Sequence, residues 1–507
     1  MGRFKHDDYA QTMMVPISLE KQLMPGTLEF ATHELIHRRV DTSIFASRYK
    51  NDEIGCSAYD PKILLKVVLF AYSRGILSSR KIERACQEHI TFMALACGMV
   101  PDHGTIAACI SSMKDEIIAI FRDILLVCVE QDLLGGTHFA LGGLKLASNA
   151  AKEWSGTFDD LKQRQGKLAA KVRQLLEQHE TADQAGEGSL SEACHAERAK
   201  VDEQITRLAK QAARIEAFLA TSEPKRGKRG EELQSNLTDN DSAKMQTAHG
   251  VIQGYNGQAL VDARYQVIVH AEAFGNGQDY GHVSPLLAGA KANVKAIGLP
   301  EEYFEGRILS ADSNYHSEAN LTTCAQEKLD AYIPDPHFRQ RDPRFATQER
   351  HKLPTEEKFT LADFTYNNEQ DCSMCPQGKL LTLEARRHKM GNNIYRRYEA
   401  DEADCSACPL REQCLQTAET RRKHLAVWVE SIKRTLSQQM IMKIDTPEAR
   451  KVYGLRLAIV EPVFGNIRSQ KRLDRFTLRG KIKVNIQWLL YCMVHNIEKI
   501  VNYGLAV

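Results

Sequence analysis

The chain has 507 residues, with 67 Lys and Arg against 65 Asp and Glu and a formal net charge of +2. At ~100–200 residues per domain this length allows several packing units, and 43% hydrophobic with 26% charged residues is ordinary for a folded globular protein. These values exclude a fibre and a disordered chain, and because no apolar run reaches the roughly 18 residues of a membrane helix, we expect a cytoplasmic protein without a membrane partner.

Residues 1–135 are predicted to form a helical N-terminal domain. Pro61 is placed to open a helix in which Ile63, Leu64, Val67 and Ala71 repeat at helical spacing. A break at residues 98–101 precedes a further helix, capped by Asp102 or Thr105. The pattern of helix, break and helix favours plain helical packing over a DNA-reading helix-turn-helix, and the spacing leaves both open.

A mixed α/β core interrupted by two insertions is expected after this domain. The segment 138–146 has a strand-like rhythm that we interpret as stopping in a tight turn at Gly142-Gly143. Apolar stripes over 158–220 predict a helical hairpin, and strand character returns between 236 and 320. There an apolar run leads into Asp312, a carboxylate well placed for chemistry at the end of a strand.

Five cysteines form the pattern CxxC, 29 intervening residues, CxxC, five residues and C: Cys372, Cys375, Cys405, Cys408 and Cys414. Two such knuckles complete a Cys₄ shell at ~2.3 Å from one tetrahedral ion, so the spacing predicts a structural zinc. Five thiols are one too many, and either Cys372 or Cys414 is spare. Reduced, unligated cysteines remain the alternative. A four-thiolate shell leaves no open position for a catalytic zinc.

The segment 450–483 holds ten Lys and Arg against two acids, Glu461 and Asp474, so a polyanion could bind there. A lone Glu among arginines is usually an ion-pair partner, but a carboxylate that holds Mg²⁺ beside DNA phosphates would have the same neighbours. Glu461 and Arg468 would share a helix face, and Pro462 implies that the helix is kinked or begins there.

Several segments together resemble the DDE-type transposases of bacterial insertion sequences, in the branch related to the IS4 and IS5 groups. The resemblance runs over nearly the whole chain. It rests on THFALGGLKLASNAAKEWSGT, TDNDSAKMQTAHGVIQGYNGQALVDA, ILSADSNYHSEANL, CSACPLREQC and YGLRLAIVEPVFGNIR.

This resemblance implies an RNase H-like catalytic core in which two Asp and one Glu bind two divalent ions, Mg²⁺ or Mn²⁺, behind an N-terminal DNA-binding domain. Asp312 matches the second Asp and Glu461 matches the Glu, whereas Gly142 stands where the first Asp is expected. Glycine offers no side-chain oxygen, so metal binding should weaken severely. The residues expected to contact DNA are Tyr453, Arg456, Arg468, Lys471 and Arg472, with a core role the equal alternative for Tyr453.

The implied domain plan assigns 136–157 and 236–320 to the first part of the catalytic domain and 446–507 to its last part. The intervening insertions are a helical hairpin with its linker (158–235) and a Cys-rich segment (321–445). The implied function is metal-dependent cleavage and strand transfer at element ends, impaired here because of Gly142, with double-stranded DNA bearing terminal inverted repeats and target DNA as partners. We expect a homodimer on DNA, associated with the nucleoid. The alternative is an inactive DNA-binding derivative that competes at element ends.

Overall fold

The computed structural model describes residues 16–49, 57–185, 192–227, 230–345, 347–348, 358–359, 361–367, 371–390, 393–417, 419–431 and 435–505. The chain divides into two compact units. The first comprises Met1–Asp279, Pro285–Phe304 and Leu457–Val507, and the second comprises Tyr280–Ser284 and Glu305–Arg456. Among the helices of these ranges, none is long and apolar enough to cross a membrane.

The N-terminal part of the first unit is helical, as predicted. Its α-helices are α1 (Leu28–Arg38), α2 (Pro61–Ser73), α3 (Ser79–Glu88), α4 (Ile90–Leu95), α5 (His103–Ser112) and α6 (Glu116–Glu130). Pro61 opens α2, whose N-cap Asp60 accepts from the Lys62 amide, and Asp102 caps α5 by accepting from the Thr105 amide. The predicted helix after Ser79 is divided at His89, where the backbone is extended.

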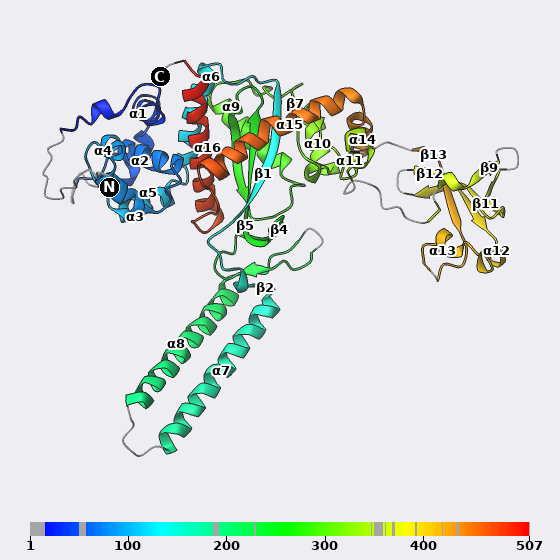
Figure 1. Ribbon diagram of the computed structural model, residues 1–507, viewed down its shortest axis with the longest axis horizontal. Helices are drawn as coiled ribbons and strands as arrows, with labels where there is room; N and C mark the ends of the chain where they lie inside the picture. The colour runs from blue at the N-terminus through cyan, green and yellow to red at the C-terminus, as the bar shows by residue number, and fades with distance from the viewer. Residues whose placement is uncertain are drawn as a thin grey trace, which may run out of the picture. The chain divides into compact units, whose positions relative to one another are not determined.

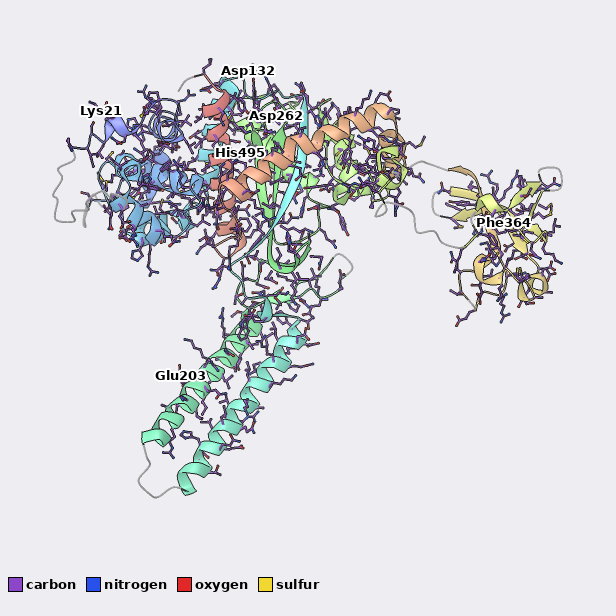
Figure 2. The ribbon with its side chains drawn as sticks, viewed as in Figure 1. Lys21, Asp132, Glu203, Asp262, Phe364 and His495 are labelled. Atoms are coloured by element: carbon purple, nitrogen blue, oxygen red, sulfur yellow. The ribbon has the colours of Figure 1, made fainter. Side chains whose placement is uncertain are left out.

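An antiparallel sheet forms the centre of the first unit. Its strands are β1 (His138–Ala147), β4 (Ala243–Thr247), β5 (Gly250–Asp262) and β6 (Ile268–Phe274). One edge of β5 pairs with β1 over residues 254–262 of β5. The other edge pairs with β4 over residues 250–254 and with β6 over residues 256–261. Asp262, at the end of β5 (Figure 2), accepts from the amides of Gly135 and Gly136 and so fixes the chain where it enters β1.

The predicted tight turn at Gly142-Gly143 is wrong. β1 runs straight through both glycines, which pair with Ala259 and Gln258 of β5. The glycines serve close packing instead, because a Cβ on Gly143 would lie 2.2 Å from the Gln258 amide nitrogen. The Gly-Gly pair therefore marks a place where other groups approach the backbone on both faces of the strand.

Helix α16 (Lys481–Tyr503) lies beside α6 and α2 (Figure 1), and it also packs against β6. Asn485 exchanges two hydrogen bonds with the backbone of Ala273, and Asn496 does the same with Ile268. Asn485 and Asn496 are eleven residues apart on the helix, and Ile268 and Ala273 are five residues apart on the strand. Both separations correspond to roughly 16 Å, so each side-chain amide lies opposite its backbone partner. The edge strand is thus satisfied by side chains instead of by another strand.

Two long helices, α7 (Phe158–Ala185) and α8 (Glu192–Thr221), form the predicted hairpin (Figure 1). The short strands β2 (Ser155–Gly156) and β3 (Ser235–Asn236) pair at its base. There Leu161 and Ile215 pack with Leu237, and Trp154 lies under the Arg164 guanidinium at 4.0 Å. Burial of this apolar base ties the hairpin to the strands.

The second unit contains a parallel pair, β7 (Ile308–Ser310) and β8 (Asp330–Tyr332), with helices α10 (Glu318–Gln326), α11 (Phe338–Arg341) and α14 (Leu436–Ile444). Its Cys-rich part is an antiparallel sheet in the order β13-β12-β11-β10-β9. The bounds are β9 Thr365–Asn367, β10 Cys372–Met374, β11 Leu380–Met390, β12 Asn393–Ala400 and β13 His424–Ser431. Phe364 (Figure 2), Leu381 and Tyr398 form the core of this sheet.

Candidate catalytic site, cysteine cluster and nucleic-acid interface

Gly142 faces helix α15 (Pro447–Gly465) across an apolar contact within the first unit. A Cβ built on Gly142 would lie 2.6 Å from the Phe464 ring and 3.3 Å from Val460 Cβ. Val460 and Phe464 are one helical turn apart, and both are buried. The Phe464 ring in turn stacks on Trp488 of α16, with centroids 6.4 Å apart. The position expected to hold the first catalytic carboxylate is therefore packed against hydrocarbon.

Glu461 follows Val460 directly on α15, and its side chain is exposed. The helix neither begins at Pro462 nor ends there, because α15 continues to Gly465. Proline cannot donate to the carbonyl four residues earlier, and that carbonyl, on Ala458, accepts from the Gln266 side-chain amide at 2.9 Å. Gln266 thus supplies the hydrogen bond that Pro462 lacks and supports the backbone that carries Glu461.

Arg468 lies in a π-helical turn, Asn466–Gln470, directly after α15. Its side chain is exposed. The expectation that Glu461 and Arg468 share one α-helical face assumed a continuous α-helix. The change to π-helical winding between the two residues removes that basis, and such turns are frequent at functional sites.

Asp312 follows strand β7 in the second unit, as the sequence predicted. It caps the 3₁₀ turn Ser313–Tyr315 and accepts from the Asn314 amide at 2.9 Å. Tyr453 of α15 lies close both to Asp312 and to Arg456 of the same helix: burial raises the pKa of Tyr453, the charge of Arg456 and a hydrogen bond with it lower that pKa, and the charge of Asp312 raises it. The structure thus brings together three of the predicted residues, and Arg456 is only 7% exposed.

Lys471, one of the residues expected to contact DNA, is fully buried in this structure. Its ammonium pairs with Glu498 of α16 at 2.5 Å and also bonds to Asn466. Burial lowers the pKa of Lys471, and the Glu498 carboxylate raises it. The residue is a structural cation that ties the turn after α15 to α16. Its neighbour Arg472 is exposed, with a positive φ of 55°.

The remaining arginines of the basic segment have backbone partners. Arg475 donates to the Ser148 carbonyl and Arg479 to the Asn149 carbonyl, both just after β1. Lys481 pairs with Glu272. The segment is therefore anchored to the end of β1, and Arg468 and Arg472 are its exposed members among the residues predicted to bind DNA.

Other acids near the strands have structural partners. Tyr255 donates to Asp239, and the amides of Asn256 and Gln258 donate to Asp279. Burial raises the pKa of Asp262, against the lowering effect of the three backbone amides that it accepts from. Gln258 and Asn256 pack beside Gly143, on the opposite face of β1 from Phe464. The atoms nearest to a Cβ on Gly142 belong to Phe464 and Val460, and none belongs to these three acids.

Four of the five clustered cysteines are neighbours. Burial raises the pKa of Cys414, the charge of Lys423 lowers it, and the thiols of Cys405, Cys375 and Cys408 raise it further. The Lys379 amide donates to the Cys375 sulfur at 3.3 Å. Cys372 is 7% exposed and lies in β10, where it pairs with Asn367. Among the described residues, no three of these sulfurs lie within 4.8 Å of one another, so the thiols stand farther apart than in a closed metal shell.

A second group, which the sequence did not indicate, lies on the same sheet. Glu384, Glu399 and His424 bring three possible ligand atoms within 4.8 Å of one another. Arg397 pairs with Glu384 at 2.7 Å, and Arg422 pairs with Glu399 at 3.2 Å. Cross-strand pairing of β11, β12 and β13 places these residues together, so no sequence spacing could have revealed them.

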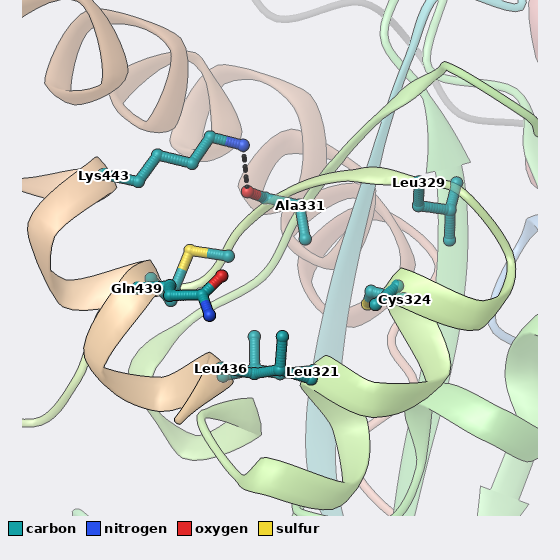
Figure 3. Close-up of a pocket in the computed structure, with 9 residues that line it drawn as sticks. Leu321, Cys324, Leu329, Ala331, Leu436, Gln439 and Lys443 are labelled. Carbon is teal, nitrogen blue, oxygen red and sulfur yellow. Dashed lines mark hydrogen bonds between the residues drawn. The ribbon is translucent and has the colours of Figure 1, made fainter. Parts of the chain in front are cut away.

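A small pocket of the second unit lies between α10, β8 and α14 (Figure 3). Its walls are mainly apolar, including Leu321, Cys324 and Leu436, and at one side Lys443 donates to the Ala331 carbonyl. It holds none of the predicted site residues. It does not suit a phosphate or a pair of metal ions, because it offers a single cation that is already paired with Asp330.

Two family models match the chain. Residues 374–501 match a transposase DDE domain, and residues 18–112 match a transposase domain (DUF772). Both matched segments are those of transposases, which supports a DDE-type transposase. DDE-type transposases in general cleave and transfer DNA and use divalent metal ions, and the mixed α/β fold of the chain is consistent with such a protein. The first match includes Glu461 and four of the clustered cysteines, whereas Gly142 and Asp312 lie outside both matches. No curated protein matches the chain.

Proposed function

We propose that this transposase acts at the ends of an insertion sequence of the IS4/IS5-related branch, by metal-dependent cleavage and strand transfer, and that Gly142 impairs this copy. The observation that carries the proposal is the contact between Gly142 and α15. Gly142 lies on β1 facing Val460 and Phe464, directly beside Glu461 in the chain. A residue at position 142 is therefore suited to act together with a carboxylate on α15.

We infer an RNase H-like core from the match to a transposase DDE domain. The first unit contributes the antiparallel strands β1, β5 and β6, and the second unit contributes the parallel pair β7 and β8. In this proposal Asp312 and Glu461 hold the divalent ions, Mg²⁺ or Mn²⁺, which would activate the attacking oxygen and stabilise the leaving one. Asp312 and Glu461 alone supply fewer carboxylate ligands than two ions require, because Gly142 has no side-chain oxygen.

We propose that DNA contacts divide between two parts of the chain. Helices α1–α6 are proposed to read sequence, and exposed Arg468 and Arg472 are proposed to hold the phosphate backbone, with Tyr453 and Arg456 beside Asp312. Lys471 is left out because it is buried against Glu498. The DNA carries terminal inverted repeats and the protein binds it as a homodimer at the nucleoid, together with target DNA.

A second candidate is a DNA-binding derivative without catalysis that occupies element ends as a competitor. The packing of Phe464 against Gly142 favours it, because the apolar contact closes the space that a carboxylate would need. A cleavage assay in Mg²⁺ and in Mn²⁺, on DNA bearing the element's own ends, separates the two candidates. Binding of these ends without nicking supports the competitor, and nicking by the unmodified chain supports the enzyme.

For the Cys-rich sheet we propose a structural zinc held by Cys375, Cys405, Cys408 and Cys414. The four thiols influence one another electrostatically, and the Lys379 amide bonds to a sulfur as in a metal knuckle. Thiolates are the ligands that zinc prefers, and metal binding would draw them to its coordination distance. Cys372 is the spare residue in this proposal because it lies within β10.

A further inference from the structure

The helical hairpin has a strongly divided charge distribution that the proposed function does not use. Residues 162–173 of α7 and 207–214 of α8 contain eight Lys and Arg and no acid. The intervening residues 174–206, which include the rest of α7 and of α8 away from β2, contain eight acids and two Lys and Arg. The half of the hairpin nearest to β2 is therefore mainly basic, since its acids are Asp159, Asp160 and Glu216, and the far half is mainly acidic.

Helical geometry gathers four of the basic residues into one patch. At 100° per residue, Lys167 and Lys171 lie about 40° apart around α7, and Arg207 and Lys210 lie about 60° apart around α8. The antiparallel register places both pairs at the same level, because Leu161 and Ile215 share a cluster near the base while His179 pairs with Asp202 farther out. We call these four side chains the proximal patch.

The buried residues of the hairpin define which side the proximal patch occupies. Leu161 and Leu175 mark the face of α7 that packs on α8, and Ala212 and Ile215 mark the corresponding face of α8. Measured from these faces, both pairs of the patch lie on one side of the hairpin. Lys162 and Arg173, which are equally exposed, lie on the other side of α7.

The charges of the proximal patch have no carboxylate partner within the described residues. All four side chains are exposed, and the hydrogen bond of Lys171 goes to a neutral amide, that of Gln174. Arginines of the Cys-rich sheet differ, because Arg396, Arg397 and Arg422 each pair with an acid. Acids border the patch instead of neutralising it: Asp160 lies at the base and Glu203 (Figure 2) lies beyond Arg207 toward the far end.

We propose that the proximal patch binds the phosphate backbone of duplex DNA without sequence preference, as an arm that holds DNA while the element ends are engaged. The proposal rests on the proposed function for its choice of partner. A row of exposed, unpaired cations at one level of two packed helices complements the regular phosphates of a duplex. The acidic far half would repel the same duplex and so confine the contact to the base of the hairpin.

The test uses the full chain and a random-sequence duplex, with binding measured by fluorescence anisotropy over a range of salt concentrations. Removing one cation that binds a phosphate should flatten the plot of log affinity against log salt by about 0.9. We expect Lys167→Gln with Lys171→Gln, and Arg207→Gln with Lys210→Gln, each to flatten the slope by up to about 1.8. The matched control, Lys162→Gln with Arg173→Gln, removes the same charge from the other side of α7 and should leave the slope unchanged.

Equal salt slopes for the patch and control variants would overturn the proposal. This holds if both variants flatten the slope, which indicates a diffuse charge effect, and equally if neither variant changes it. Circular dichroism of each variant verifies that the hairpin is folded, which exposed substitutions should not disturb. Discrimination between element ends and random duplex is measured in parallel. Its absence in the unmodified chain would count against the proposed function, whereas the salt slopes decide the hairpin proposal alone.

Discussion

The two metal sites proposed for this chain differ in how their ligands are supplied. In the Cys-rich sheet, Cys405, Cys408 and Cys414 come from ten consecutive residues, and Cys375 is brought to them by the sheet. The proposed catalytic set comes from positions 142, 312 and 461, each on a different element, and Gly142 has no side-chain oxygen. A site built from local spacing depends on few elements, whereas a site assembled from distant elements can lose a ligand through one substitution.

The largest expected effect is the restoration of cleavage at position 142. Gly142→Asp alone must displace the Phe464 ring, which lies 2.6 Å from the new Cβ. We therefore expect weak nicking of element ends from Gly142→Asp and a stronger signal when Phe464→Leu is added to make room. A change of 1.4 kcal/mol in the barrier is tenfold in rate, so a restored metal ligand should be readily visible on a gel.

Two controls define this result. Gly142→Asn has nearly the same shape without the carboxylate and should not cleave, and Glu461→Gln should abolish whatever Gly142→Asp gains. If the unmodified chain cuts as fast as the Asp variant, then another residue supplies the first ligand and position 142 is not the catalytic position.

The second effect concerns zinc. We expect one zinc per chain in the purified protein, lost in Cys405→Ser and in Cys414→Ser and retained in Cys372→Ser, because Cys372 belongs to β10 and the others surround one volume. Metal analysis by mass spectrometry measures this directly. A Cys372→Ser protein without zinc would show that the fourth ligand has been assigned to the wrong cysteine.

The third prediction compares the effects of replacing Lys471 and Arg468, two cations of the same segment, on stability and on DNA binding. Lys471→Met leaves Glu498 without its partner and should lower the free energy of unfolding by about 3 kcal/mol, the cost of breaking a buried pair. Arg468→Ala, at an exposed site, should change stability by less than about 0.5 kcal/mol. We expect only Arg468→Ala to flatten the salt dependence of DNA binding. Urea unfolding and anisotropy test the pair, and a stable Lys471→Met protein with weakened DNA binding would return Lys471 to the DNA surface.

The smallest effect is on acid stability. Burial lowers the pKa of His270 to about 4 and that of His495 (Figure 2) to about 3, below the ordinary value of 6.5. Below pH 6.5 the unfolded chain therefore binds more protons than the folded chain, so the free energy of unfolding is highest above that pH and falls as the pH decreases. At pH 5.5 each histidine should lower the free energy of unfolding by about 1.4 kcal/mol. Urea midpoints at pH 7.5 and 5.5 measure the loss, which His495→Gln should reduce; an unchanged pH dependence in that variant would contradict the assignment.

Sequence patterns that depend only on nearby residues in the chain predicted several elements correctly. Pro61 and Asp102 mark the helix starts, the apolar stripes predict the hairpin α7–α8, and Asp312 directly follows a strand. Each of these rests on backbone rules that act within a few residues. The cysteine spacing likewise drew attention to five thiols of one segment, and it could not choose between Cys372 and Cys414 as the spare residue.

The sequence alone thus determined the helical N-terminal part, the hairpin and the candidate residues at 142, 312 and 461. Only the tertiary structure decided that Gly142-Gly143 continues a strand, because the reason lies in Phe464 and Gln258, which are distant in the chain. It also decided that Lys471 is buried while Arg468 is exposed, although both are basic residues of one segment. Burial depends on packing against α16, and a charge pattern carries no information about which side of a turn another helix will cover.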